Sequence, residues 1–119
     1  MRLTEAEWSV MDVLWSGERF SLKDIAAVLA KTNGWSKNTV HTYLTRMEGK
    51  GLVQIDRTQT KPYLALVSRD DVARRERDQL LHKVYGGAAG DLIAAFLKET
   101  PISHQEADRL RQLLDEMEV

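Results

Sequence analysis

The order of secondary-structure patterns in residues 1–67 constrains the fold of this chain more than any other feature. Thr4 begins a capping-box pattern ahead of apolar residues at helical spacing, which predicts a first helix over about residues 5–16. Ser21 is a suitable N-cap for a second amphipathic helix, and the Asn-Gly pair at 33–34 is expected to end it. Two short helices in quick succession are therefore predicted to open the chain.

A third helix and a β-hairpin are predicted to follow. Ser36 is the expected N-cap of the helix, which Gly49 and Gly51 should end. Two β-rich runs, 52–55 and 62–67, flank the polar residues 56–61, a pattern typical of a hairpin whose loop is longer than a tight turn. The first part of the chain thus predicts a helix-turn-helix with an appended wing, in a protein that is mainly α with a small β-hairpin.

The second part of the chain, residues 68–119, is predicted to be all-α. A long helix is expected over 70–85, a glycine-rich break at 86–90, a short apolar helix over 92–97, and a last helix capped by Ser103. These helices carry more aliphatic side chains than so short a region can enclose. A second copy of the chain is the expected cover, with folding back onto the preceding domain as the alternative. The predicted dimerisation residues are Leu80, Leu81, Val84, Leu92, Ile93, Phe96, Leu97, Leu110, Leu113 and Leu114.

The composition of the chain excludes several classes of protein. Its 119 residues suffice for about one domain, and 43% apolar with 29% charged residues is ordinary for a folded protein. Cysteine is absent, which excludes disulfides, thiol nucleophiles and thiolate metal sites. No apolar run approaches the ~20 residues of a membrane helix and the N-terminus lacks a signal-peptide pattern, so we expect a cytoplasmic protein without a membrane partner.

Basic charge is concentrated in one part of the chain. The formal net charge is −1, but residues 31–63 contain six Lys or Arg against two Asp or Glu. A basic stretch within a near-neutral chain is typical of a surface that attracts phosphate backbones, and a solvated face without a ligand is the alternative.

The predicted third helix has an outward side suited to a DNA major groove. Val40, Leu44 and Met47 are spaced to face the core, so helical geometry turns the opposite side outward. That side is cationic and polar, and Asn, Lys, His and Thr are side chains that recognise base edges. Basic residues at the hairpin tip are placed to contact the DNA backbone. The candidate DNA-binding residues are Lys37, Asn38, Thr39, His41, Thr42, Thr45 and Arg46 on the helix, with Arg57 and Lys61 on the wing.

These patterns predict a winged helix-turn-helix DNA-binding domain over residues 1–67 and a helical dimerisation region over 68–119. The competing function is a winged-helix module that binds another protein and never touches DNA. An enzyme is not expected, because the three histidines fall on separate predicted helices and no phosphate-binding glycine loop is found. No cofactor and no metal are expected.

Segments along nearly the whole chain carry a resemblance to a known family. Glu5–Trp15 reads EAEWSVMDVLW, residues 35–47 read WSKNTVHTYLTRM, and residues 50–53 read KGLV. The pattern continues beyond the hairpin in segments 83–87, 92–97 and 102–103. Together they resemble the penicillinase-repressor (BlaI/MecI-type) family of winged-helix repressors of β-lactamase and methicillin-resistance genes.

The resemblance implies a homodimer with interlocked C-terminal helices, whose two winged domains bind successive major grooves of a palindromic operator. In antibiotic-sensing members, a signal from a membrane sensor-protease leads to cleavage of an Asn-Phe bond in the penultimate helix. The aligned pair here is Ala95-Phe96, which is the candidate cleavage bond for a signalling protease. Related copper-responsive repressors carry a C-terminal Cys-x-Cys cluster, which this cysteine-free chain lacks.

Overall fold

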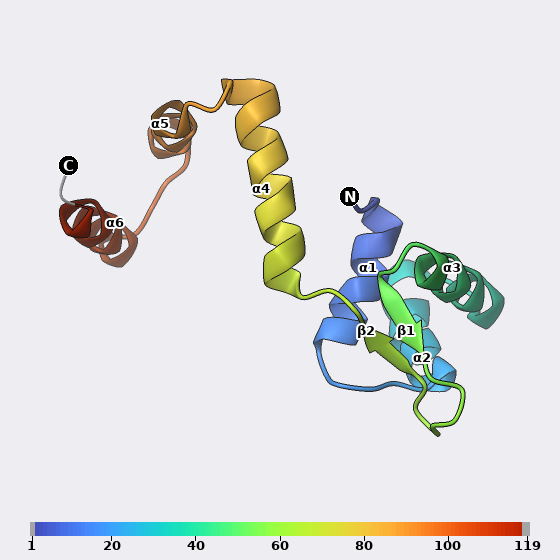
Figure 1. Cartoon of the computed structure of the whole chain (residues 1–119). Helices are drawn as coiled ribbons and strands as arrows, with labels where there is room; N and C mark the ends of the chain where they lie inside the picture. Colours follow the sequence, from blue (N-terminus) through green and yellow to red (C-terminus); the bar gives the residue numbers. More distant parts are fainter. Residues whose placement is uncertain (1, 118–119) are drawn as a thin grey trace. The chain divides into compact units, whose positions relative to one another are not determined.

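A computed structural model describes residues 2–117, within which the chain forms six helices and one two-stranded antiparallel sheet. The fold class predicted from the sequence, mainly α with a small β-hairpin, is confirmed (Figure 1). The elements in chain order are α1 (Glu5–Trp15), α2 (Leu22–Asn33), α3 (Lys37–Gly49), β1 (Val53–Ile55), β2 (Tyr63–Ala65), α4 (Arg69–Tyr85), α5 (Ala89–Glu99) and α6 (His104–Glu116).

Contacts within the chain divide it into two compact units, Met1–Glu76 and Arg77–Val119. The division falls inside α4, so the first unit extends past residue 67 and includes the first turns of that helix. None of the helices within residues 2–117 is long and apolar enough to cross a membrane.

Side-chain caps explain where most of the helices begin. Thr4, Ser21 and Ser103 each form a complete capping box, and the Ser36 hydroxyl accepts the backbone N–H of Thr39 at 3.2 Å. Each cap satisfies a backbone donor that has no partner inside the helix. These local signals are the reason why the helix starts agree with the sequence prediction.

The glycine-rich break before α5 is shorter than predicted. Gly86 and Gly87 adopt φ of 56° and 88° and end α4, but Gly90 lies in the first turn of α5, which begins at Ala89. The expectation that Gly90 interrupts the helix is therefore wrong. Glycine weakens a helix through backbone entropy, by about 0.5–1 kcal/mol relative to alanine, which is too little to end a helix by itself.

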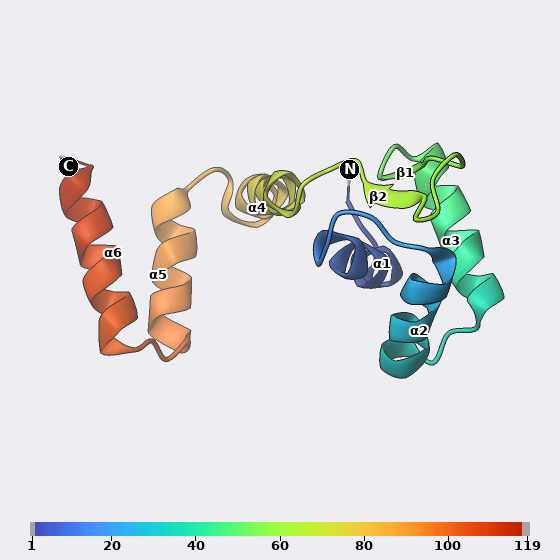
Figure 2. The same cartoon turned by 90° about the horizontal axis from the view of Figure 1, so that it is seen from below.

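The core of the first unit lies among α1, α2, α3 and the hairpin. The connection before α2 also contributes, because the backbone of Phe20 forms a two-bond bridge with Tyr63 of β2 at 2.9 and 3.0 Å. Figure 2 shows the hairpin beside the C-terminal end of α3. The buried apolar residues are Leu3, Val10, Met11, Val13, Leu14, Ile25, Leu29, Val40, Leu44, Met47, Leu52, Val53, Tyr63 and Val72.

The second unit has no comparable core within the described residues. Neither α5 nor α6 contains a buried residue, although both are amphipathic. Exposed apolar side chains at this density are typical of a surface that binds another molecule.

Candidate nucleic-acid interface

Helix α3 is held in the first unit by one fully buried side. Val40, Leu44 and Met47 are each 0% exposed, as their spacing predicted. Trp35, immediately before the N-cap, stacks on Tyr43 with ring centroids 4.7 Å apart and planes 12° apart. The apolar side and this aromatic stack together fix the rotation of α3 about its own axis.

The opposite side of α3 is exposed and brings most of the predicted helix residues together. We call this surface the reading face, defined by Lys37, Asn38, His41, Thr42, Thr45 and Arg46. Thr39 lies at its edge instead: it is half-buried, and its hydroxyl is 3.0 Å from the Ser36 hydroxyl of the cap.

Two threonines of the reading face use their hydroxyl protons within the helix. Thr42 donates to the carbonyl of Asn38 at 2.9 Å, and Thr45 donates to the carbonyl of His41 at 3.0 Å. Their oxygens therefore remain acceptors, and their methyl groups remain available for apolar contact with a thymine methyl.

The wing consists of β1, β2 and the loop 56–62. Its strands pair in register with Val53 opposite Ala65 and Ile55 opposite Tyr63. Asp56 orders the loop: its carboxylate accepts the Thr58 hydroxyl at 2.6 Å and the Thr58 N–H at 3.1 Å. These hydrogen bonds lower the pKa of Asp56, so this acid is an ionised structural group at the wing tip. Lys61 is exposed in the same loop.

Arg57, the other predicted wing residue, is paired with the only carboxylate of α3. Its two terminal nitrogens donate to the two oxygens of Glu48 at 3.2 and 3.3 Å. The hydrogen bond with Glu48 raises the pKa of Arg57 above its already high ordinary value, so the guanidinium is permanently charged. Sequence analysis did not find this pair. The available signal was the short connection between α3 and β1, which makes the hairpin return beside the helix end.

A second ion pair holds the end of α3 against α1. Lys50, the C-cap residue of α3, donates from Nζ to Glu7 Oε2 at 2.8 Å, and the Glu7 side chain is only 5% exposed. Burial raises the pKa of Glu7, but hydrogen bonds from Lys50 and from the Thr4 backbone outweigh it, and the pKa lies below its usual value. Lys50 is therefore a structural cation rather than a free one.

The remaining basic side chains around the interface are available to a phosphate backbone. Within residues 2–117, Lys37, Arg46 and Lys61 form no ion pair with a carboxylate. Lys31, in the last turn of α2, is exposed and likewise unpaired among the described residues, so the basic excess of residues 31–63 reduces to these four lysines and arginines and the exposed remainder of Arg57.

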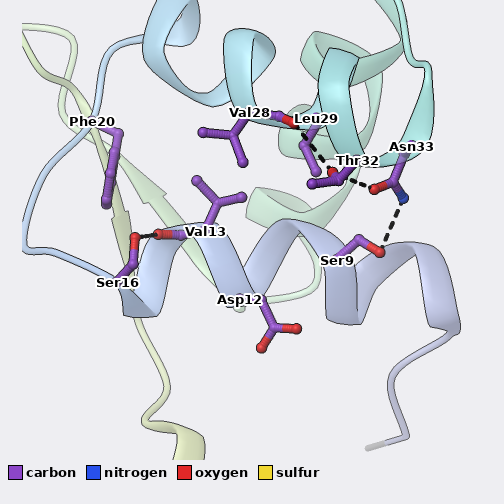
Figure 3. Close-up of a pocket in the computed structure, with 9 residues that line it drawn as sticks. All are labelled: Ser9, Asp12, Val13, Ser16, Phe20, Val28, Leu29, Thr32 and Asn33. Carbon is purple, nitrogen blue, oxygen red and sulfur yellow. Dashed lines mark hydrogen bonds between the residues drawn. The ribbon is translucent and has the colours of Figure 1, made fainter.

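A groove of ≈ 330 Å³ lies between α1 and α2 and is lined by residues of these helices and of the connection between them (Figure 3). Its rim is a chain of internal hydrogen bonds: Thr32 donates to Asn33 at 2.7 Å, and the Asn33 amide donates to Ser9 at 3.1 Å. Asp12, its charged residue, pairs with Arg69 at the start of α4. These polar groups already have partners, and the hydrogen bond from Asn33 to Ser9 ties α2 to α1.

The predicted dimerisation residues lie on α4 after residue 76, on α5 and on α6. Seven of them are exposed, from Leu80 at 40% to Val84 at 61%, while Leu81, Leu92 and Leu110 are half-buried. Ile102 and Met117 extend this exposed apolar set. In the candidate cleavage pair, Ala95 is half-buried and Phe96 is 57% exposed, and both lie inside α5.

Helices α2 and α3 form a short pair, α3 carries the exposed cationic side, and the hairpin lies beside the end of α3. This arrangement defines a winged helix-turn-helix protein. The family model described as penicillinase repressor matches residues 3–116, and the chain belongs to this family. It is therefore a transcriptional regulator of the repressor type, a class of DNA-binding proteins that are not enzymes.

Relatives found by sequence similarity agree with this assignment. The methicillin resistance regulatory protein MecI of Staphylococcus aureus (strain N315) is 29% identical over 116 residues, covering 95% of this chain and 93% of the relative. The penicillinase repressors of Staphylococcus aureus and Bacillus licheniformis are 25% and 26% identical, covering 98% and 97% of this chain and 94% and 91% of the relatives. Among solved structures, a MarR/EmrR family transcriptional regulator from Acinetobacter sp. ADP1 has a TM-score of 0.47 and 22% identity, covering 97% of this chain and 73% of that one.

Proposed function

We propose that this protein is a sequence-specific repressor that binds a palindromic operator as a homodimer and controls β-lactamase or other antibiotic-resistance genes. Residues 1–67 would bind DNA and residues 68–119 would form the dimer. The observation that carries the proposal is the exposure of the whole reading face opposite the fully buried Val40, Leu44 and Met47. Operator DNA is reached in the cytoplasm, which is the proposed place of action.

The reading face supplies the contacts to bases in this proposal. Asn38 is suited to adenine, while Lys37 and His41 are suited to guanine. Arg46, Arg57 and Lys61 supply contacts to phosphates, with Thr39, Thr42 and Thr45 completing the surface. Two reading faces related by a two-fold axis would meet half-sites about one helical turn, ~34–36 Å, or a multiple of it apart.

The exposed apolar surface of α4, α5 and α6 supports the homodimer. Phe96, Leu97 and Leu114 are each about half exposed in the single chain. A two-fold partner that presents the same surface would bury them without requiring a different protein.

Binding to DNA is tested with a duplex selected from a randomised pool by the wild-type protein and a scrambled duplex of the same composition. The affinity for both should fall with salt, with a log–log slope of about −0.9 for each phosphate neutralised. Asn38→Ala and His41→Ala should cost about 1–3 kcal/mol on the selected duplex and little on the scrambled one. Lys61→Gln should weaken both equally. A wild-type protein that forms no salt-sensitive complex with either duplex would instead favour a protein-binding module.

We further propose that induction cuts the Ala95-Phe96 bond, in line with the family resemblance. Cleavage there would remove α6 and the end of α5 from the dimerisation region and so weaken operator binding. The test is the mass of the repressor recovered from its own cells after exposure to a β-lactam. A fragment that ends at residue 95 is expected, and an intact chain in fully induced cells would refute cleavage.

A further inference from the structure

The carboxylate of Glu48 stands beside the reading face, where a negative charge is unfavourable for a DNA-binding surface. Glu48 follows Thr45 by three positions and His41 by seven, so the three side chains share one side of α3. The Glu48 side chain is 34% exposed. An unpaired carboxylate at this place would repel a phosphate backbone lying against the wing.

Arg57 neutralises this carboxylate in the free protein. The two hydrogen bonds at 3.2 and 3.3 Å join the guanidinium to both oxygens of Glu48, and the Arg57 side chain is 69% exposed. At a distance the pair has no net charge, so it adds little to long-range attraction between the wing and DNA. At contact the pair still offers donors, because a guanidinium has five N–H groups and this pairing uses two.

The pairing also fixes where Arg57 can act. Glu48 belongs to α3 and Arg57 to the wing, so the hydrogen bonds hold the guanidinium at a set place relative to the reading face. Its free N–H groups are therefore held where they can meet a phosphate when α3 is seated in a groove.

We propose that Glu48 is a specificity-determining residue, which rests on the proposed function in DNA binding. By pairing with Arg57 it withholds one positive charge from non-specific DNA and keeps that arginine positioned for the operator complex. Glu48 therefore lowers the affinity for arbitrary sequence more than the affinity for the operator.

The test substitutes Glu48→Gln and measures binding to the selected and the scrambled duplexes over a range of salt. Releasing one cation should steepen the log–log salt slope on the scrambled duplex by about 0.9. If variant and wild type bind this duplex equally at 1 M salt, the variant should bind it up to about eightfold more tightly than the wild type at 0.1 M. Affinity for the selected duplex should rise less, because Arg57 already contacts phosphate there. The ratio of the two affinities should therefore fall.

Two variants separate this role from charge alone. Glu48→Gln/Arg57→Gln has the wild-type net charge and should return the scrambled-duplex slope to the wild-type value. Asp108→Asn releases Arg111 from another exposed ion pair, at 2.9 Å on α6, and should leave the slope unchanged. Thermal unfolding checks that all variants fold.

The proposal is overturned if Glu48→Gln matches Asp108→Asn in slope and affinity, or if it changes both duplexes equally. These results would leave the proposed function intact, since the wild type would still bind DNA. Absence of any salt-sensitive complex with the wild type would overturn both.

Discussion

At the scale of single residues, the carboxylates Glu7, Glu48 and Asp56 set the surroundings of the reading face and the wing. Glu7 anchors the C-cap Lys50, Glu48 holds Arg57, and Asp56 orders the wing loop through Thr58. Glu48 and Asp56 belong to the basic stretch 31–63, and Glu7 pairs with a lysine of that stretch, so none of the three is free to oppose a phosphate backbone. The balance of charge at this surface therefore depends on which basic residues are paired, not on how many there are.

Glu7→Gln is expected to lower the free energy of unfolding at neutral pH by about 1–3 kcal/mol, because it removes the charge from a buried hydrogen-bonded pair. The pKa of Glu7 in the folded chain lies below its ordinary value of 4.5, so its contribution is fully present above pH 4.5. It is lost as the pH falls through the folded-state pKa. Urea unfolding of both proteins between neutral pH and about pH 3 measures the difference, which should shrink towards the acid end.

Glu5→Gln is the matched control, since Glu5 is an exposed carboxylate in the same turn of α1. Its stability curve should follow that of the wild type at neutral pH. A difference between Glu7→Gln and the wild type that stays constant at every pH would contradict the assigned role of the Glu7 charge.

At the scale of elements, the start of α4 is fixed to α1. The Trp15 indole N–H donates to the Val67 carbonyl at 2.9 Å, and the Arg69 guanidinium lies 5.1 Å from the centre of the Trp15 ring. Arg69 also pairs with Asp12, and Val72 is buried in the core. The first turns of α4 are therefore part of the first unit, Met1–Glu76, which contains the wing and is the winged unit of the chain.

Trp15→Phe should lower the free energy of unfolding by about 1 kcal/mol more than Trp8→Phe. The two indoles pack edge to face at 5.6 Å in the same helix, but only Trp15 donates a hydrogen bond to Val67. Trp8→Phe therefore controls for the loss of ring area. Denaturation followed by circular dichroism measures both, and equal losses would show that the hydrogen bond contributes nothing.

The elements themselves were largely predictable from the sequence, while their connections were not. Capping boxes, glycines and apolar spacing act within a few residues, so Thr4, Ser21 and Ser36 marked the helix starts correctly. The pair of Lys50 with Glu7 joins residues 43 positions apart, and the pair of Arg57 with Glu48 spans nine. Such contacts depend on how helices and hairpin pack together, which periodicity does not report. The same limit explains why Arg57 was predicted on the wing without its partner.

At the scale of the whole molecule, the two units differ in how completely they enclose their apolar residues. The winged unit contains every buried apolar residue among the described residues, whereas α5 and α6 contain none. This contrast supports the proposal that the first part of the chain binds DNA and that the second part forms the dimer.

Leu114→Asp is expected to weaken the proposed homodimer by about tenfold to a hundredfold, because it places an unpaired charge on a surface that association would desolvate. Leu114 is 54% exposed in the single chain. Gln112→Asp, which adds the same charge at an exposed polar position of α6, should leave the dimer unchanged. Sedimentation equilibrium measures both, and a dimer that withstands Leu114→Asp would exclude this surface.

The positions of the tryptophans make intrinsic fluorescence a probe of one unit only. All three, Trp8, Trp15 and Trp35, pack against the core of the winged unit, and the rest of the chain has none. Emission from these indoles therefore reports melting of the winged unit alone, while far-ultraviolet ellipticity reports every helix. If the two units unfold separately, the two signals should give different midpoints in one titration. If α5 and α6 form the proposed dimer, dilution should move only the ellipticity transition that belongs to these helices.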